Sequence, residues 1–400
     1  MPKLKRDMTM EEQLARGPID LPFLMLVVLL TGIGVIMVFS ASYATALNEG
    51  HAATYYFIRQ GLFAGMGIML MYITSKINYQ AFRWMSVFVL GFALVLLVLV
   101  LVPGIHTNRG DGVKRWIRSI GPIPAFQPSE FAKLGVILYF SARMSKRESE
   151  KKKKFNTRTL SGTLLQKVDG WGFTELIPYG VILLVIMLLM KLEPHMSGTI
   201  LILVPAAAIL FAGGVKMGWF ALGGAGVGGL LALTMTGYQS TRILVWKDPW
   251  SYPRDGGYQI IQSLYAIGSG GLFGVGFGQS RQKQLFIPEP ENDFIFSIVC
   301  EELGMIGAGL ILLLFALLIV RGYWIALHAR DRFGSLLAVG VTTLMAAQVF
   351  LNISVVTNFL PTTGISLPFF SYGGTALMIQ LIEMGIVLGV SRQIPAPKQG

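Results

Sequence analysis

The stretch LGMIGAGLILLLFALLIV, residues 303–320, decides the fold class, because it runs for about 18 residues without a single charged side chain. A second stretch of similar length, MSVFVLGFALVLLVLVLV at 85–102, is equally free of charge. A helix needs roughly 20 mostly apolar residues to cross a hydrocarbon core of about 30 Å. A helix also satisfies its backbone polar groups within one segment, as lipid requires. Both stretches therefore predict transmembrane helices.

Similar apolar segments recur along the whole chain. Hydrophobic residues make up 53% of the 400 positions and charged residues only 14%, which is too apolar for a water-soluble domain of this length. We expect an all-α, polytopic integral membrane protein with about ten transmembrane helices. The predicted spans are 21–43, 55–75, 83–102, 128–144, 173–190, 198–214, 218–236, 293–321, 334–357 and 370–391.

The distribution of Lys and Arg predicts the orientation. Basic residues gather before the first span, in the 145–172 loop with its Lys151–Lys154 run, and after the eighth span. Because cytoplasmic loops collect Lys and Arg, both termini should be cytoplasmic. The expected organisation is a cytoplasmic tail at 1–20, one transmembrane domain at 21–392 and a cytoplasmic tail at 393–400. Extracellular loops are expected at 103–127 and, between the seventh and eighth helices, at 237–292.

The two outer loops contain basic residues that this orientation does not favour. They are Arg109, Lys114, Arg115, Arg118, Arg242, Lys247, Arg254, Arg281 and Lys283. Their retention outside indicates an anionic ligand, with phosphate the leading candidate. The alternative is ordinary pairing with acidic residues of the same loops, such as Glu289 and Glu291, or contact with lipid headgroups.

Several acidic residues lie at or inside the ends of predicted helices. Asp293 stands at the start of the eighth span, where it could cap the helix or, partly desolvated, act as a general base. Glu130 and Lys133 share one helix face and can pair. Glu301 and Glu302 lie about two turns into the eighth span, where ionisable groups face a bundle interior or a wet cavity. Buried structural ion pairs are the alternative for both pairs.

The long 237–292 loop shows two further patterns. Apolar spacing through Tyr258–Ile267 predicts an amphipathic helix in the membrane interface. The glycine-rich stretch GSGGLFGVGFG at 268–278 follows no predicted strand, so close backbone packing or a re-entrant turn is favoured over a nucleotide loop. The four histidines are scattered and Cys300 is the only cysteine, which makes a structural zinc site or an internal disulfide improbable.

Several short motifs, taken together and in order, resemble the shape, elongation, division and sporulation (SEDS) family. They are KRWI at 114–117, QPSEFAKL at 127–134, GYQIIQS at 257–263, AIGSGG at 266–271, NDFIF at 292–296, EELG at 301–304, LPTTGIS at 360–366 and LPFFSYGG at 367–374. They cover nearly the whole chain. The LVPG at 101–104 and the FLPTTG near the end resemble FtsW- and SpoVE-like members more than RodA-like ones.

The resemblance implies a peptidoglycan glycosyltransferase of the bacterial cytoplasmic membrane. Such an enzyme polymerises lipid II at the outer face, in division or sporulation, together with a class B penicillin-binding protein and other divisome or elongasome proteins. Asp293 is the expected catalytic residue. Expected substrate- or pyrophosphate-binding residues are Arg109, Lys114, Arg115, Trp116, Glu130, Lys133, Arg242, Gln259 and Ser371. A divalent cation, Mg²⁺ or Mn²⁺, is expected on the pyrophosphate, and no residue of the chain is assigned as its ligand. No organic cofactor and no nucleic-acid partner are expected.

One segment departs from the family pattern, and two other functions stay open. Many members have Gln-Pro-Asp-x-Gly-Thr before the sixth span, whereas this chain has EPHMSGT at 193–199, so no role of that Asp carries over. A lipid II flippase would need its key charges near the membrane midplane. A non-catalytic scaffold of the wall-synthesis complex would tolerate loss of the outer acidic and basic residues.

Overall fold

The computed structural model describes residues 17–107, 115–119, 124–146, 173–193, 196–233, 237–254 and 256–394. Its helices are α2 (Leu21–Asn48), α3 (Tyr55–Lys76), α4 (Gln80–Leu99), α5 (Pro128–Lys146), α7 (Phe173–Leu192), α8 (Met196–Ala212), α9 (Met217–Leu233), α10 (Gly237–Lys247), α11 (Gly257–Gly270), α12 (Ile295–His328), α13 (Arg332–Val356) and α14 (Gly374–Ser391), with a short 3₁₀ turn at Pro249–Ser251. The described residues form no strand, only isolated bridges at His106, Ile117 and Phe126. The all-α prediction is confirmed.

Each predicted apolar segment coincides with a helix of the structure. Six helices in the described part are long and apolar enough to cross a membrane: α2, α3, α4, α12, α13 and α14. Two shorter apolar helices lie at Leu176–Leu192 and Met196–Ala212. The count of ten spans and the cytoplasmic placement of the termini stay predictions, as do the domain boundaries, and the 145–172 loop lies almost entirely outside the described residues.

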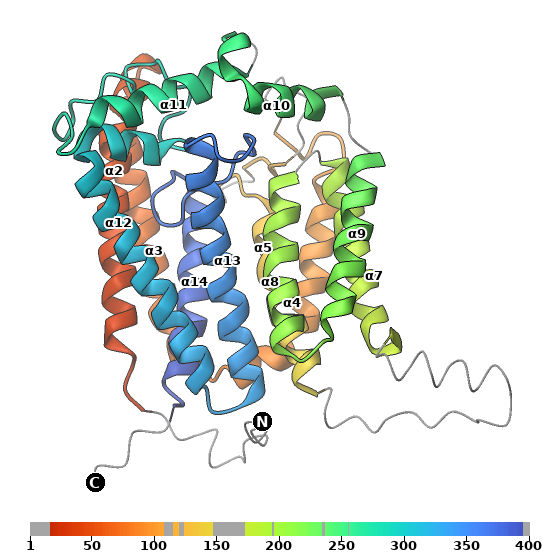
Figure 1. Ribbon diagram of the computed structural model, residues 1–400. Coiled ribbons are helices and arrows are strands. Elements are labelled where there is room, and N and C mark those ends of the chain that lie inside the picture. Colours follow the sequence, from red (N-terminus) through yellow and green to blue (C-terminus); the bar gives the residue numbers. More distant parts are fainter. Residues whose placement is uncertain are drawn as a thin grey trace, which may run out of the picture.

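The helices form an upright bundle with α13 and α14 in its middle (Figure 1). Helix α14 packs on α3, and glycines allow the two to approach closely. A Cβ atom at Gly374 would lie 2.2 Å from the Phe63 ring, and one at Gly385 would lie 2.5 Å from the Met71 carbonyl oxygen. Small residues at these contacts therefore fix the centre of the bundle.

Helices α10 and α11 cross one end of the bundle (Figure 1). The predicted amphipathic helix at Tyr258–Ile267 is confirmed as α11, which buries Ile260, Ile261 and Ala266 and exposes Tyr258 and Tyr265. The end of the bundle under these two helices also holds the start of α12 and the 357–373 segment, which connects α13 to α14. Most candidate residues lie at this end.

Helix α12 is broken near its start, and the glycine-rich stretch packs against the break. Gly304 has φ 67° and ψ −173°, which interrupts the helix. Gly274 has φ +82°, and a Cβ atom there would lie 2.1 Å from the carbonyl oxygen of Glu302. Only glycine permits both the backbone conformation and this approach. The expectation of close backbone packing at 268–278 is therefore confirmed.

Candidate active site

Asp293 lies just ahead of α12 and is held there through its backbone. Asn352 of α13 donates from Nδ2 to the carbonyl oxygen of Asp293 at 2.8 Å and to that of Ile365 at 2.7 Å. One amide thus ties the start of α12 to the segment after α13. The turn at Gly364, with φ +65°, lies against the Asp293 carboxylate, since a Cβ atom at 364 would be 3.1 Å from its Oδ2. Neighbouring segments therefore fix the position of this carboxylate.

Ser371 supports the same segment from the other side. Its hydroxyl donates to the carbonyl oxygen of Asn292 at 2.8 Å and accepts a hydrogen bond from the Leu367 amide at 2.7 Å. The Tyr372 amide donates to the carbonyl oxygen of Glu291 at 2.8 Å. Because Ser371 is buried and fully engaged with backbone, its observed contacts are those of a positioning residue for Asp293.

Two arginines lie close enough to the Asp293 carboxylate to act on it electrostatically. Arg242 of α10 donates from Nη1 to the carbonyl oxygen of Thr362 at 2.8 Å, which places α10 over the turn beside Asp293. Arg115 comes from a separate extended segment, whose neighbour Ile117 bridges His106 and Phe126. The positive charges of Arg115 and Arg242 both act on Asp293 and lower its pKa. The structure thus brings these two predicted residues together with the predicted base.

The net effect of the surroundings raises the pKa of Asp293 to about 6. Burial is the largest cause, because it disfavours the charged carboxylate, and the negative charge of Glu289 adds to it. The two arginines offset only part of this rise. A carboxylate with such a pKa is ionised at neutral pH but more basic than an ordinary aspartate, as suits a general base.

The other predicted residues of the outer loops and α11 lie at different distances from this site or outside the described residues. Trp116 is half-buried and its carbonyl oxygen accepts from the Thr107 amide at 2.9 Å, next to Arg115. Gln259 is partly exposed on α11, and no hydrogen bond in the described part of the chain joins it to Asp293. Arg109 and Lys114 lie outside the described residues.

Glu130 and Lys133 form a buried pair on α5, with Nζ of Lys133 2.7 Å from Oε2 of Glu130. Glu383 of α14 is buried and interacts electrostatically with both. This group lies inside the bundle, and its geometry matches the structural ion pair that the sequence left open. Substrate binding by Glu130 and Lys133 stays a prediction.

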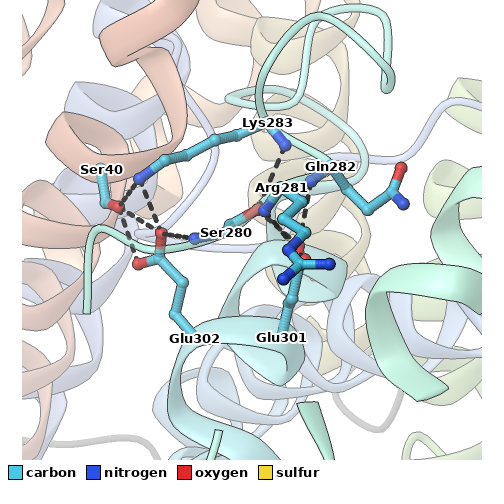
Figure 2. Close-up of polar contacts among 7 residues, drawn as sticks. All are labelled: Ser40, Ser280, Arg281, Gln282, Lys283, Glu301 and Glu302. Carbon is cyan, nitrogen blue, oxygen red and sulfur yellow. Dashed lines mark hydrogen bonds and ion pairs between the residues drawn. The ribbon is translucent and has the colours of Figure 1, made fainter. Parts of the chain in front are cut away.

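For Lys283, the structure favours ion pairing within the protein over contact with an external anion. Its side chain is 3% exposed, and Nζ lies 2.8 Å from Oε1 of Glu302 and 2.9 Å from the Ser40 hydroxyl (Figure 2). Glu301 accepts from the Ser280 hydroxyl and from the Arg281 amide at 2.9 Å. The loop folds back onto α12, so Lys283 neutralises a buried carboxylate instead of facing water.

Glu291, which the sequence offers as an alternative partner for the outer basic residues, contacts α2. It is buried and accepts a hydrogen bond from the Thr45 hydroxyl at 3.3 Å. Burial is the main cause that raises its pKa to about 7.

Sequence reasoning missed Glu193, which follows α7. It is completely buried, and neither carboxylate oxygen has a hydrogen-bond partner among the described residues. Burial raises its pKa to about 8, although the positive charge of Arg115 opposes the rise. Arg115 therefore acts on both Glu193 and Asp293. The sequence carries one signal of this site, an acidic residue at the end of an apolar span.

Comparisons with known proteins agree with these observations. The family described as "Cell cycle protein", comprising FtsW, RodA and SpoVE, matches residues 21–395. The chain is 40% identical to stage V sporulation protein E of Bacillus subtilis, covering 93% of this chain and 97% of that protein. It is 39% identical to the probable peptidoglycan glycosyltransferase FtsW of Geobacter metallireducens, covering 94% and 95%.

Two solved structures share the fold. A chain from the structure reported as "Structural coordination of polymerization and crosslinking by a peptidoglycan synthase complex" superposes with a TM-score of 0.69 and 27% identity, covering 94% of this chain and 98% of that one. The rod shape determining protein RodA of Thermus thermophilus superposes with a TM-score of 0.64 and 25% identity, covering 95% and 98%.

Proposed function

This chain belongs to the FtsW, RodA and SpoVE family, and from that premise we infer that it is a peptidoglycan glycosyltransferase with Asp293 as its base. The observation that carries the assignment of Asp293 is its setting: its backbone is held by Asn352, its pKa is raised to about 6, and the charges of Arg115 and Arg242 act on it. The acceptor's hydroxyl group needs a base, and the departing pyrophosphate needs positive charge. The site offers both.

The reaction follows from these roles. Asp293 takes the proton from the hydroxyl group of the acceptor sugar as its oxygen attacks the anomeric carbon of the lipid-linked donor. The new glycosidic C–O bond forms while the bond from the anomeric carbon to the pyrophosphate oxygen breaks. The electron pair of that bond leaves with the undecaprenyl pyrophosphate, whose growing negative charge Arg115 and Arg242 stabilise. The substrate under this proposal is lipid II.

We keep a divalent cation, Mg²⁺ or Mn²⁺, within the proposal. In the described part of the chain no group of three His, Cys, Asp or Glu side chains could hold a metal ion. A cation here would therefore take most of its ligands from the substrate's pyrophosphate, as Mg²⁺ often does. When bound, it would neutralise charge on the leaving group.

Membrane placement and partners complete the proposal. The chain is a multi-pass membrane protein, and its Lys and Arg distribution supports a cytoplasmic membrane with the Asp293 end outside. A class B penicillin-binding protein is the proposed partner, supported by the similarity to a chain of a peptidoglycan synthase complex that coordinates polymerization and crosslinking.

A lipid II flippase is the second candidate, favoured by the buried charges of Glu130, Lys133 and Glu383 within the bundle. Asp293, Arg115, Arg242 and Glu289 instead gather at one end, which suits chemistry at a membrane surface better than transport.

An assay in detergent distinguishes the glycosyltransferase from the flippase. Purified protein, with its transpeptidase partner, is incubated with lipid II in micelles, where polymerisation can proceed but translocation has no meaning. Glycan chains resolved on a gel support the glycosyltransferase. Absence of chains in detergent, together with lipid II translocation by the same preparation in liposomes, would replace it with the flippase.

A further inference from the structure

Two polar contacts join α12 to the start of α2 and to its later part, and the apolar part of both helices lies between them. At one end Arg321 of α12 donates from Nη2 to Oδ2 of Asp20 at 2.7 Å. At the other end the Ser40 hydroxyl of α2 donates to Glu302 of α12 at 2.7 Å (Figure 2). Asp20, the residue before α2, and Ser40 are 20 positions apart along that unbroken helix. A helix rises about 1.5 Å per residue, so the two contacts lie about 30 Å apart, which is the thickness of a bilayer's hydrocarbon core.

The turn after α11, residues 271–277, extends past the Ser40–Glu302 contact towards the apolar part of α12. The amides of Val275 and Gly276 donate to the carbonyl oxygens of Glu301 and Glu302 at 2.9 and 3.1 Å. Continuing along α12, the amides of Met305 and Ile306 donate to the carbonyl oxygens of Gly271 and Leu272 at 2.9 and 3.1 Å. The turn runs beside the ends of α2 and α12 in Figure 1. Leu272 is therefore level with residue 306, on the apolar side of Glu302.

The side chains of this turn are apolar, large and uncovered. Phe273 is 80% exposed, Leu272 54%, Phe277 49% and Val275 42%. The face continues along α12 through Met305 and Ile306, which are 65% and 48% exposed, towards Leu310 at 58%. An exposed apolar patch of this kind marks contact with another apolar phase. Its continuity with the outward face of a spanning helix identifies that phase as lipid.

We propose that the turn 271–277 is inserted into the leaflet on the Asp293 side, with Phe273 and Leu272 among the acyl chains. The glycines at 271, 274 and 276 let the chain turn and dock its backbone on α12, which satisfies amides that lipid could not. The same turn leads directly into the loop that carries Lys283 and ends at Asp293. The inserted turn thus anchors the loop from residue 278 to Asp293 to the bilayer. This role does not depend on which substrate the site uses.

The test measures the depth of single spin labels. Cys300 is the only cysteine, so Cys300→Ser provides a background for Phe273→Cys, with Leu310→Cys as the lipid-facing reference and Lys247→Cys, exposed on α10, as the aqueous one. Each variant carries a nitroxide label in vesicles of phosphatidylcholine and phosphatidylglycerol. Collisional broadening by oxygen, which concentrates in lipid, is compared with that by a water-soluble nickel chelate.

The proposal predicts that position 273 resembles position 310, with an oxygen-to-nickel accessibility ratio several-fold above that at 247. A ratio equal to that at 247 would overturn it. Exclusion of both reagents would also overturn it, because it would mean that protein covers the turn. If Phe273→Cys does not fold, Leu272→Cys is read against the same references.

Discussion

The ammonium group of Lys283 lies 2.8 Å from Oε1 of Glu302, and the two side chains are 3% and 0% exposed. Lys283 belongs to the loop that leads to Asp293, and Glu302 lies within α12 just beyond it. The pair therefore joins the loop that precedes Asp293, the proposed base, to the helix that follows it. The Ser40 hydroxyl, which bonds to both, extends this connection to α2.

Replacement of Lys283 by Met should destabilise the protein strongly. The substitution keeps an unbranched side chain only one heavy atom shorter but leaves the Glu302 carboxylate buried without its cation, at a cost of about 3–5 kcal/mol for such a pair. Thermal unfolding in detergent measures the loss. The double variant Lys283→Met/Glu302→Gln should recover much of it, because the uncompensated charge is gone. Equal stability of Lys283→Met and wild type would contradict the role of this pair.

The rate of polymerisation should depend on pH through Asp293. Because the pKa of Asp293 is raised to about 6, activity at low substrate concentration should rise through that pH and level off above it. The Glu289 charge contributes to the raised pKa, so Glu289→Gln should move the acidic limb to lower pH. Asp248→Asn is the control. It removes an exposed acid that accepts a hydrogen bond from the Ser251 hydroxyl, and it should leave the acidic limb of the pH profile in place. Identical shifts in both variants would count against a local effect of Glu289.

Removal of Arg115 should shift the same limb in the opposite direction. The guanidinium lowers the pKa of Asp293, so Arg115→Gln should move the limb to higher pH. It should also reduce turnover by roughly 10²-fold if Arg115 stabilises the departing pyrophosphate, as loss of one such donor does elsewhere. The pH profile and the plateau rate are read from one titration. A lower plateau with an unmoved limb would place Arg115 away from Asp293.

Stability should depend on pH through Glu193. Its folded-state pKa is raised from 4.5 to about 8, so the folded protein holds this proton more tightly than the unfolded chain. The resulting stability is fully present below about pH 4.5 and is lost as pH rises towards 8. Glu193→Gln carries no such proton and should flatten this part of the dependence. Melting temperatures of both proteins across that range provide the measurement, and parallel curves would show that Glu193 does not titrate as described.

Hydropathy located the helices well because each predicted span is a long apolar run that only a helix can satisfy in lipid. Asp293 is visible in the sequence as an acid at a helix start, but its catalytic role is implied by the family resemblance and stays a prediction. Sequence reasoning left the role of Lys283 open, because charge patterning does not reveal that a loop folds back to meet Glu302. Ser371 was found only through a resemblance, and its backbone contacts depend on tertiary structure. Glu193 was missed because nothing local indicates that its carboxylate is buried beside Arg115.

The most direct test of the central claim compares wild type with Asp293→Asn in polymerisation of purified lipid II. Asparagine keeps the size of the side chain and leaves the backbone bond from Asn352 in place, so the fold should persist and be verified by an unchanged melting temperature. The predicted result is glycan chains from wild type and a rate reduced by about 10²–10⁴-fold in the variant, the usual contribution of a general base. Equal rates from two folded proteins would remove Asp293 from the mechanism.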